Sequence, residues 1–165
     1  MRHKILYHNN SLLKQVSRPV TNFQEISEIV DKLKESLRYE DKVWTGTGLS
    51  LCGIQIGIPL RVIILARPLF WTHCKFHHGF DIIINPKILK SDSAIVEDWE
   101  GCLSYPDIEC FVPRPKKIEL EYLSFSNISK KKTLDNLAAR VLQHEIDHLD
   151  GVLMTEKAVD SRKKT

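Results

Sequence analysis

Residues 143–148, Gln-His-Glu-Ile-Asp-His, constrain this chain more than any other stretch, because their spacing suits one secondary structure and one kind of chemistry. In an α-helix, residues four positions apart lie on the same face, so His144 and His148 can direct both imidazoles at one ion. Glu145 follows the first histidine, close enough to exchange a proton with a water molecule on that ion. The pattern therefore predicts a helix that carries two metal ligands and a general base, with a third ligand elsewhere.

The third ligand is expected upstream of this helix. One class of zinc peptidases has a downstream histidine, but Met154 stands at that position, and the chain after it is too short for another ligand-bearing helix. Residues 100–104, Glu-Gly-Cys-Leu-Ser, offer Cys102, whose thiolate is a strong ligand for a divalent ion. Cys102 and the two histidines would leave a fourth position for water, as is typical of catalytic sites. Cys110 and Asp98 remain alternative third ligands.

Three segments of the chain, in the order in which they occur, resemble the three sequence motifs of the peptide deformylase family. Residues 143–151 and 100–104 match the family motifs Q-H-E-x-D-H-L-x-G and E-G-C-L-S throughout. Residues 48–55 resemble a third motif, G-x-G-x-A-A-x-Q, with Ser50 in place of the second glycine and Cys52-Gly53 in place of the two alanines. The resemblance spans residues 4–156.

This resemblance implies a metal-dependent hydrolase that removes the formyl group from the N-terminal formyl-methionine of newly made polypeptides and releases formate. It implies one divalent ion per chain, Fe²⁺ in preference to Zn²⁺ or Ni²⁺, although the ligand types do not decide among these ions. Glu145 would act as general base. The side-chain amide of Gln55 and the backbone N–H of Leu103 would stabilise the negative charge that develops on the tetrahedral intermediate.

The resemblance also implies a set of substrate-binding positions, namely Gly48, Leu49, Ser50, Gly101, Leu137 and Val141. The apolar members of this set would form a methionine pocket. In the family, the second glycine of the first motif runs beside the bound peptide. Ser50 adds a Cβ at this position, so we expect it to change substrate affinity or specificity and to leave the metal chemistry intact.

Two other functions stay open. An H-E-x-x-H metallopeptidase would cleave peptides that carry no formyl group. A catalytically weak paralogue would bind nascent chains or ribosomes without turnover. Glu145 and Gln55 argue against such a paralogue, because a binding protein needs no general base.

Composition agrees with an ordinary globular enzyme. The chain has 165 residues and a net charge of +3, which gives no reason to expect a specific nucleic-acid partner. It has no apolar run long enough to span a bilayer and no apolar segment typical of a signal peptide, so we expect a cytoplasmic protein. Residues 161–165 are expected to form a solvated basic tail, with a weak ribosome contact as the alternative. Cys52, Cys74 and Cys110 are expected to be incidental free thiols.

The hydrophobic pattern predicts one α+β domain over residues 1–165, in which mixed or antiparallel sheets pack around the helix with the histidines and residues 156–165 form the tail. The polar segment 73–78, with its histidines and Cys74, is expected to be a surface loop rather than a second metal site. The expected elements are a helix over 24–41, strands at 61–66, at 81–84 (ended by Asn85-Pro86) and around 118–122, a polar turn at 126–132, and a helix over 136–149 capped by Thr133 or Asp135.

Overall fold

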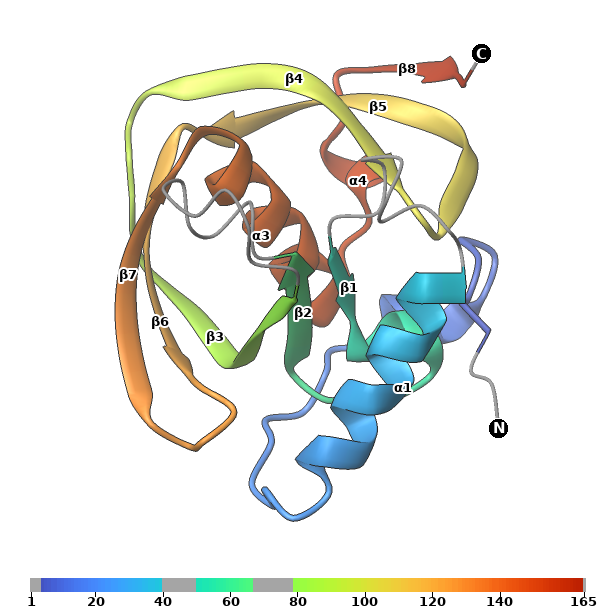
Figure 1. Cartoon of the computed structure of the whole chain (residues 1–165). Helices are drawn as coiled ribbons and strands as arrows, with labels where there is room; N and C mark the ends of the chain where they lie inside the picture. The colour runs from blue at the N-terminus through green and yellow to red at the C-terminus, as the bar shows by residue number, and fades with distance from the viewer. Residues whose placement is uncertain (1–3, 40–49, 67–78, 165) are drawn as a thin grey trace.

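The structure is a computed structural model that describes residues 4–39, 50–66 and 79–164 (Figure 1). Its elements, in chain order, are η1 (Ser11–Lys14), α1 (Ile26–Tyr39), β1 (Ser50–Cys52), η2 (Gly53–Ile56), β2 (Val62–Ala66), β3 (Phe80–Ser91), β4 (Ile95–Cys102), β5 (Tyr105–Pro115), β6 (Lys117–Leu123), β7 (Ser129–Asp135), α3 (Asn136–Leu149), α4 (Met154–Lys157) and β8 (Asp160–Lys163). The segment 73–78, with its expected surface loop, lies outside the described residues.

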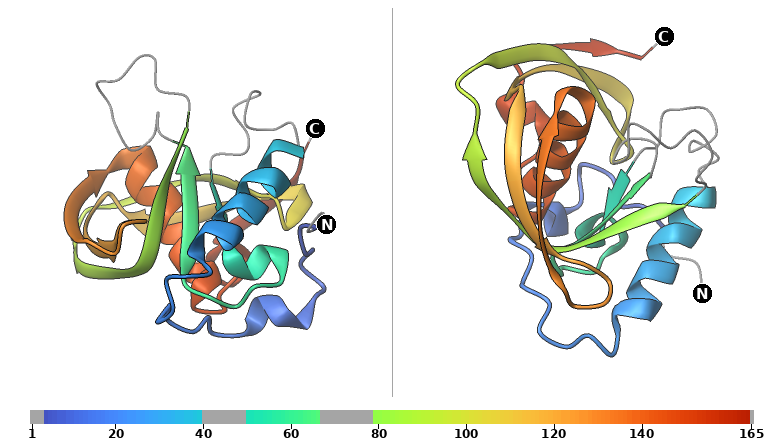
Figure 2. Two further views of the ribbon diagram at one scale, coloured as in Figure 1. Left: turned by 60° about the horizontal axis from the view of Figure 1, so that its bottom comes forward. Right: turned by 60° about the vertical axis from the view of Figure 1, so that its left-hand side comes forward.

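The strands form two antiparallel sheets, which confirms the α+β prediction. One sheet has the order β1-β2-β3-β6-β7, and the other has the order β4-β5-β8. Helix α3 contacts β1, β6 and β7 of the first sheet and β5 of the second. Figures 1 and 2 show this helix inside the curve that the strands describe. None of the described helices is long and apolar enough to cross a membrane.

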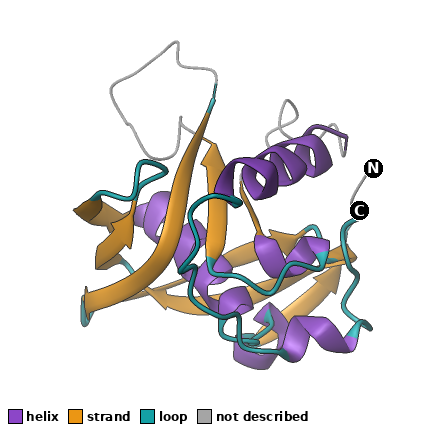
Figure 3. Ribbon diagram, turned by 90° about the horizontal axis from the view of Figure 1, so that it is seen from below, coloured by secondary structure: helices purple, strands orange, loops and turns teal. Residues whose placement is uncertain are grey.

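Strand β2 separates two hydrophobic cores. Alternate side chains of a strand point to opposite faces, and here Val62 and Ile64 pack in the core with α1, whereas Ile63 and Leu65 pack in the core with α3. Burial on both faces explains why this strand is continuously apolar. Helix α1 covers β1 and β2 on the side opposite α3 (Figure 3).

Helix α3 follows the predicted bounds of 136–149. Its buried residues Ala139, Leu142, Ile146 and Leu149 form one apolar stripe, and full burial of a leucine or isoleucine contributes about 1.5–3 kcal/mol. Asp135 occupies the N-cap position, although its side chain makes no capping hydrogen bond.

Just after α3, Gly151 has φ +74°, and a Cβ there would lie 2.6 Å from the Lys14 carbonyl oxygen. Any larger residue would therefore meet both backbone strain and a steric clash, which explains the glycine that closes the motif.

Strand β3 corrects the prediction that Asn85-Pro86 ends a strand. The strand continues to Ser91 across a register shift between Ile84 and Lys87. Asn85 has φ 51°, a conformation that asparagine tolerates, and its side chain accepts from the Val20 N–H at 2.8 Å and donates to the Val20 carbonyl at 2.9 Å. The break in the pattern is a bulge tied to the N-terminal segment.

Residues 126–128 lie in a turn as predicted, but the rest of the predicted turn, and residues 160–163, form strands. Residues 129–135 form β7, an edge strand on which Lys130 and Lys131 are exposed, as is common where a sheet edge faces water. Residues 160–163 form β8 and pair with β5, where Arg162 bonds Glu109 at 2.9 Å and lies 3.9 Å above the Trp99 ring. These contacts order the backbone of a segment whose side chains are solvated as expected, so residues 160–163 form a paired edge strand rather than a free tail.

Candidate metal centre

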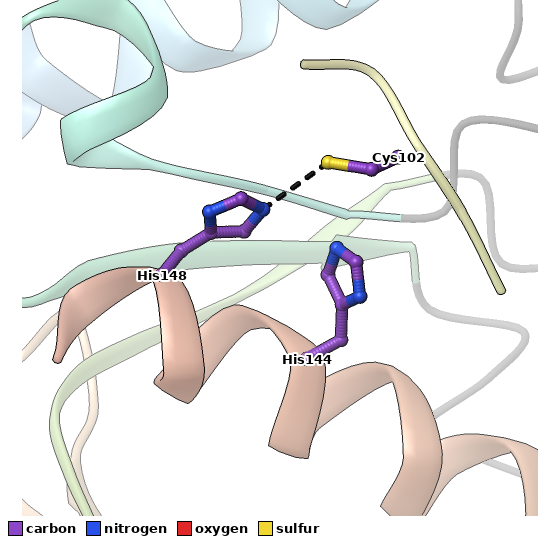
Figure 4. A group of neighbouring side chains, drawn as sticks. All are labelled: Cys102, His144 and His148. Atoms are coloured by element: carbon purple, nitrogen blue, oxygen red, sulfur yellow. Dashed lines mark hydrogen bonds between the residues drawn. The ribbon is translucent and has the colours of Figure 1, made fainter. Parts of the chain in front are cut away.

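The ligand atoms of Cys102, His144 and His148 all lie within 4.8 Å of one another. Helix α3 presents the two histidines one turn apart, and β4 ends at the cysteine (Figure 4). Cys102 Sγ lies 3.2 Å from His148 Nε2, and each of the three side chains is at least nine-tenths buried. A thiolate and two imidazole nitrogens at these separations fit a single divalent ion.

A bulge at the end of the β4–β5 hairpin aims Cys102 at the helix. Gly101 pairs with Glu109, but the next residue, Cys102, pairs with Tyr105, so the register shifts between them. Such a shift redirects a side chain. The Ser104 N–H then donates to Cys102 Sγ at 3.4 Å. The hairpin therefore supplies both the thiol and a donor that stabilises its charged form.

Electrostatics favour the thiolate form of Cys102. Burial raises the pKa of this thiol, but the charges on His148 and His144, with their hydrogen bonds, outweigh burial and lower the pKa to about 5. The thiolate is the form that binds a metal ion.

A carboxylate behind the first histidine fixes its tautomer. His144 Nδ1 lies 3.0 Å from Glu100 Oε2. Burial raises the pKa of Glu100, but hydrogen bonds from Arg114 and His144 lower it to about 2, so the group is a carboxylate that accepts a hydrogen bond from the Nδ1–H of His144. His144 Nε2, which contacts Cys102 here, is left as the atom that would bind an ion, as in other sites where a carboxylate supports a histidine ligand.

Two arginines hold this carboxylate in place. Arg114 makes a two-point ion pair with Glu100 and also donates to Asp147 Oδ2 at 2.7 Å. Arg140 donates to Glu100 Oε1 at 2.7 Å and to the Val112 carbonyl at 2.8 Å. Our reading of the sequence assigned no role to either arginine. Arg140 lies one turn before His144, which was the available signal, but its partner is 40 positions away.

The expected general base lies beside the ligands. Glu145 is 3% exposed, and its Oε1 accepts a hydrogen bond of 2.6 Å from the Ser50 hydroxyl. Its Oε2 is buried and has no hydrogen-bond partner within the described part of the chain. Ser50 reaches this position because Leu51 packs in the core with α1, so Ser50 and Cys52 face α3.

Gln55 directs its amide nitrogen toward Cys102 and Ser104. Its Oε1 accepts from the Cys52 N–H at 2.9 Å and from the Cys52 thiol at 3.3 Å. Burial raises the pKa of Cys52, and so does the neighbouring Glu145, so this thiol stays protonated and can donate. Gln55 Nε2 is left 3.3 Å from Ser104 Oγ and 3.7 Å from Cys102 Sγ. The orientation of this amide is therefore set by strand β1.

The remaining predicted positions are less closely grouped. Leu103 lies half-buried in the turn between β4 and β5, and Gly101 is exposed near the end of β4. On α3, Val141 is partly buried against the core, whereas Leu137 is 51% exposed. Gly48 and Leu49 lie outside the described residues, as does Cys74. Cys52, Cys102 and Cys110 are free and buried.

Comparisons of sequence and of structure match this chain, over nearly its whole length, to proteins of one family. The family model described as polypeptide deformylase matches residues 2–164. Peptide deformylase 2 of Nostoc sp. is 35% identical over 168 residues, covering 98% of this chain and 88% of that protein. The crystal structure of peptide deformylase from Thermotoga maritima has a TM-score of 0.83 at 29% identity, covering 97% of this chain and 99% of that one. The deformylase of Ehrlichia chaffeensis, solved in complex with actinonin, has a TM-score of 0.82 at 29% identity and covers 96% and 90%.

Proposed function

Because this chain belongs to the polypeptide deformylase family, we propose that Cys102, His144 and His148 bind its catalytic metal ion and that Glu145 is its general base. The family activity, metal-dependent hydrolysis that removes a formyl group from a peptide, is the activity of this chain. The observation that carries the assignment of residues is the convergence of three ligand atoms within 4.8 Å beside a buried carboxylate.

We propose Fe²⁺ as the ion, with Zn²⁺ and Ni²⁺ as alternatives that the same ligands accept. Held by these three residues, a divalent ion would lower the pKa of a water molecule and so would make hydroxide available near neutral pH. The thiolate of Cys102 is the form that binds a cation, and the contact with Glu100 leaves Nε2 of His144 as its ligand atom. Burial lowers the pKa of His144, but Cys102 and Glu100 raise it well above its usual value, so a proton would leave Nε2 when the ion binds.

Glu145 has the position and the free atom that a general base requires. Its Oε2 is buried and has no hydrogen-bond partner of normal geometry among the described residues, with the Cys52 thiol as a neighbour of the carboxylate, so it can accept the proton of the attacking water. The same oxygen can then donate that proton to the amine that leaves when formate is released. Burial excludes bulk water, which strengthens both transfers.

Gln55 Nε2 and the Leu103 N–H are proposed to stabilise the oxyanion. The Gln55 amide nitrogen lies near Cys102 and Ser104, and its carbonyl oxygen is held by Cys52, so the donor is oriented before substrate arrives. Leu103 follows the cysteine ligand directly, so its backbone is carried by the same turn.

The proposed substrate is the formyl-methionine end of a newly made polypeptide, which would place the reaction in the cytoplasm. Among the described strands β1 is at the edge of its sheet, so an extended peptide could pair with it there, with Ser50 and Gly101 near the scissile group. Leu49, Leu137 and Val141 are proposed to contact the methionine side chain. A weak ribosome contact would involve the exposed basic residues of β8 and Lys164.

A pair of peptides tests this proposal. Protein purified without oxygen and loaded with Fe²⁺ is given a formyl-Met tripeptide or the same tripeptide without the formyl group. We expect formate from the first and no cleavage of the second. Cleavage of a peptide bond in the second would indicate a metallopeptidase. Binding of the first without release of formate, in protein with one ion per chain, would indicate a binding protein.

A further inference from the structure

The hydroxyl of Ser50 contacts the carboxylate that the proposed mechanism uses as a base. The Ser50 Oγ to Glu145 Oε1 distance is 2.6 Å, and the pair is partly buried. Hydrogen bonds of this length from a hydroxyl to a carboxylate are short and charge-assisted, and they are about twice as strong as bonds between neutral groups. This contact is a specific interaction and not an incidental approach of two surface groups.

The contact distinguishes the two oxygens of the carboxylate. Oε1 is engaged by Ser50, whereas Oε2 is buried and has no partner in the part of the chain that the structure describes. A carboxylate held through one oxygen loses rotation about its last bond, which otherwise has a broad energy profile. Ser50 therefore determines which oxygen of Glu145 is available to react.

Serine stands here where the resembling family motif has glycine, and the backbone accepts it without strain. Ser50 lies in extended strand β1 opposite Leu65, and it is not among the described residues with positive φ. Glycine has no side chain with which to donate this bond. The substitution therefore adds an interaction at the site.

We propose that Ser50 is a positioning residue for Glu145, one that holds the carboxylate with Oε2 ready to accept the proton of the attacking water. The inference rests on the proposed role of Glu145 as general base. It also changes the expectation from sequence that Ser50 acts on substrate affinity. A residue that orients the base acts on the chemical step, so its loss lowers kcat and leaves KM nearly unchanged.

The test compares four variants in the Fe²⁺-loaded protein with a formyl-Met tripeptide. Ser50→Ala and Ser50→Gly remove the hydroxyl, Ser50→Thr keeps it, and Ser93→Ala removes an exposed hydroxyl in the β3–β4 turn as a matched control. We expect kcat to fall about 10-fold in both Ser50→Ala and Ser50→Gly, equivalent to about 1.4 kcal/mol. KM should change less than about twofold. Ser50→Thr and Ser93→Ala should retain kcat within about threefold.

Unchanged kcat in Ser50→Ala, or an effect on KM alone, would overturn the inference. So would loss of kcat in Ser50→Thr as large as in Ser50→Ala, because both would then reflect packing. Crystal structures of metal-loaded wild type and Ser50→Ala test the inference independently of turnover, because they show the orientation of the Glu145 carboxylate. We expect Glu145 to have one orientation in wild type and several, or a different one, in Ser50→Ala; the same single orientation in both would also overturn the inference. Absence of formate from wild type would count against the proposed function alone.

Discussion

At the scale of single residues, the proposed chemistry depends on the form in which each side chain is held. Cys102 is stabilised as a thiolate, His144 is held in one tautomer by Glu100, and Glu145 keeps one oxygen free. Each state is produced by a neighbour that is distant in sequence, because a buried polar group needs a partner to remain charged or oriented.

Replacement of Glu145 separates catalysis from metal binding. Glu145→Gln should lower kcat by about 10²–10⁴-fold, the usual contribution of a general acid or base, while the protein stays folded and keeps one ion per chain. Glu97→Gln, at an exposed position on β4, is the matched control and should keep the wild-type rate. The measurement is formate release with metal content determined on the same sample. A near-normal rate in metal-replete Glu145→Gln would remove this residue from the mechanism.

At the scale of elements, the geometry of the site depends on the turn that ends α3 and on the buried ion pairs that join β4 and β5 to α3. Gly151 allows the chain to turn against η1 directly after the second histidine. Arg114 joins Glu100 on β4 to Asp147 on α3, so one buried cation links the strand that carries the cysteine to the helix that carries the histidines.

Gly57 and Gly151 both have a left-handed backbone but differ in their surroundings, so alanine should lower the free energy of unfolding by different amounts at the two positions. Gly57 has φ +81° and open space around its Cβ position, whereas a Cβ on Gly151 would lie 2.6 Å from a backbone oxygen. Gly57→Ala should lower the free energy of unfolding by about 1 kcal/mol through backbone strain alone. Gly151→Ala should lower it by at least about 2 kcal/mol, because strain and clash act together. Urea denaturation measures both, and equal losses would show that the contact with Lys14 has no effect.

The buried ion pair and the surface ion pair should also differ. Arg114→Met removes the buried cation that Glu100 and Asp147 share and leaves them only Arg140 and Lys157, so it should lower the free energy of unfolding by about 3–5 kcal/mol. Arg162→Met removes a half-exposed pair with Glu109 and the contact with Trp99, and should cost about 1 kcal/mol or less. Denaturant unfolding of the two variants checks the difference. A loss in Arg114→Met as small as in Arg162→Met would mean that the network does not support the hairpin.

At the scale of the whole molecule, the local patterns were predicted well and the distant pairings were not. The bounds of α3 and the proposed ligands follow from helical spacing and short motifs, which depend on neighbours in sequence. Strand β8 and the extension of β3 form by pairing with strands that are distant in sequence, and local composition does not reveal such pairing. The polar residues of β8 therefore suggested a tail, and Asn85-Pro86 suggested the end of a strand. The contact between Ser50 and Glu145 joins positions 95 apart and has no signal in either segment.

Stepwise reconstitution with metal tests the central claim most directly, namely that Cys102, His144 and His148 form one catalytic metal site. Protein stripped by a chelator is titrated anaerobically with Fe²⁺, and formate release from a formyl-Met tripeptide is measured at each step. We predict that activity rises in proportion to bound metal and reaches its plateau at one ion per chain, and that Cys102→Ser retains less metal because a hydroxyl is a much poorer ligand. Full activity in metal-free protein, or a full metal complement in Cys102→Ser, would contradict this account.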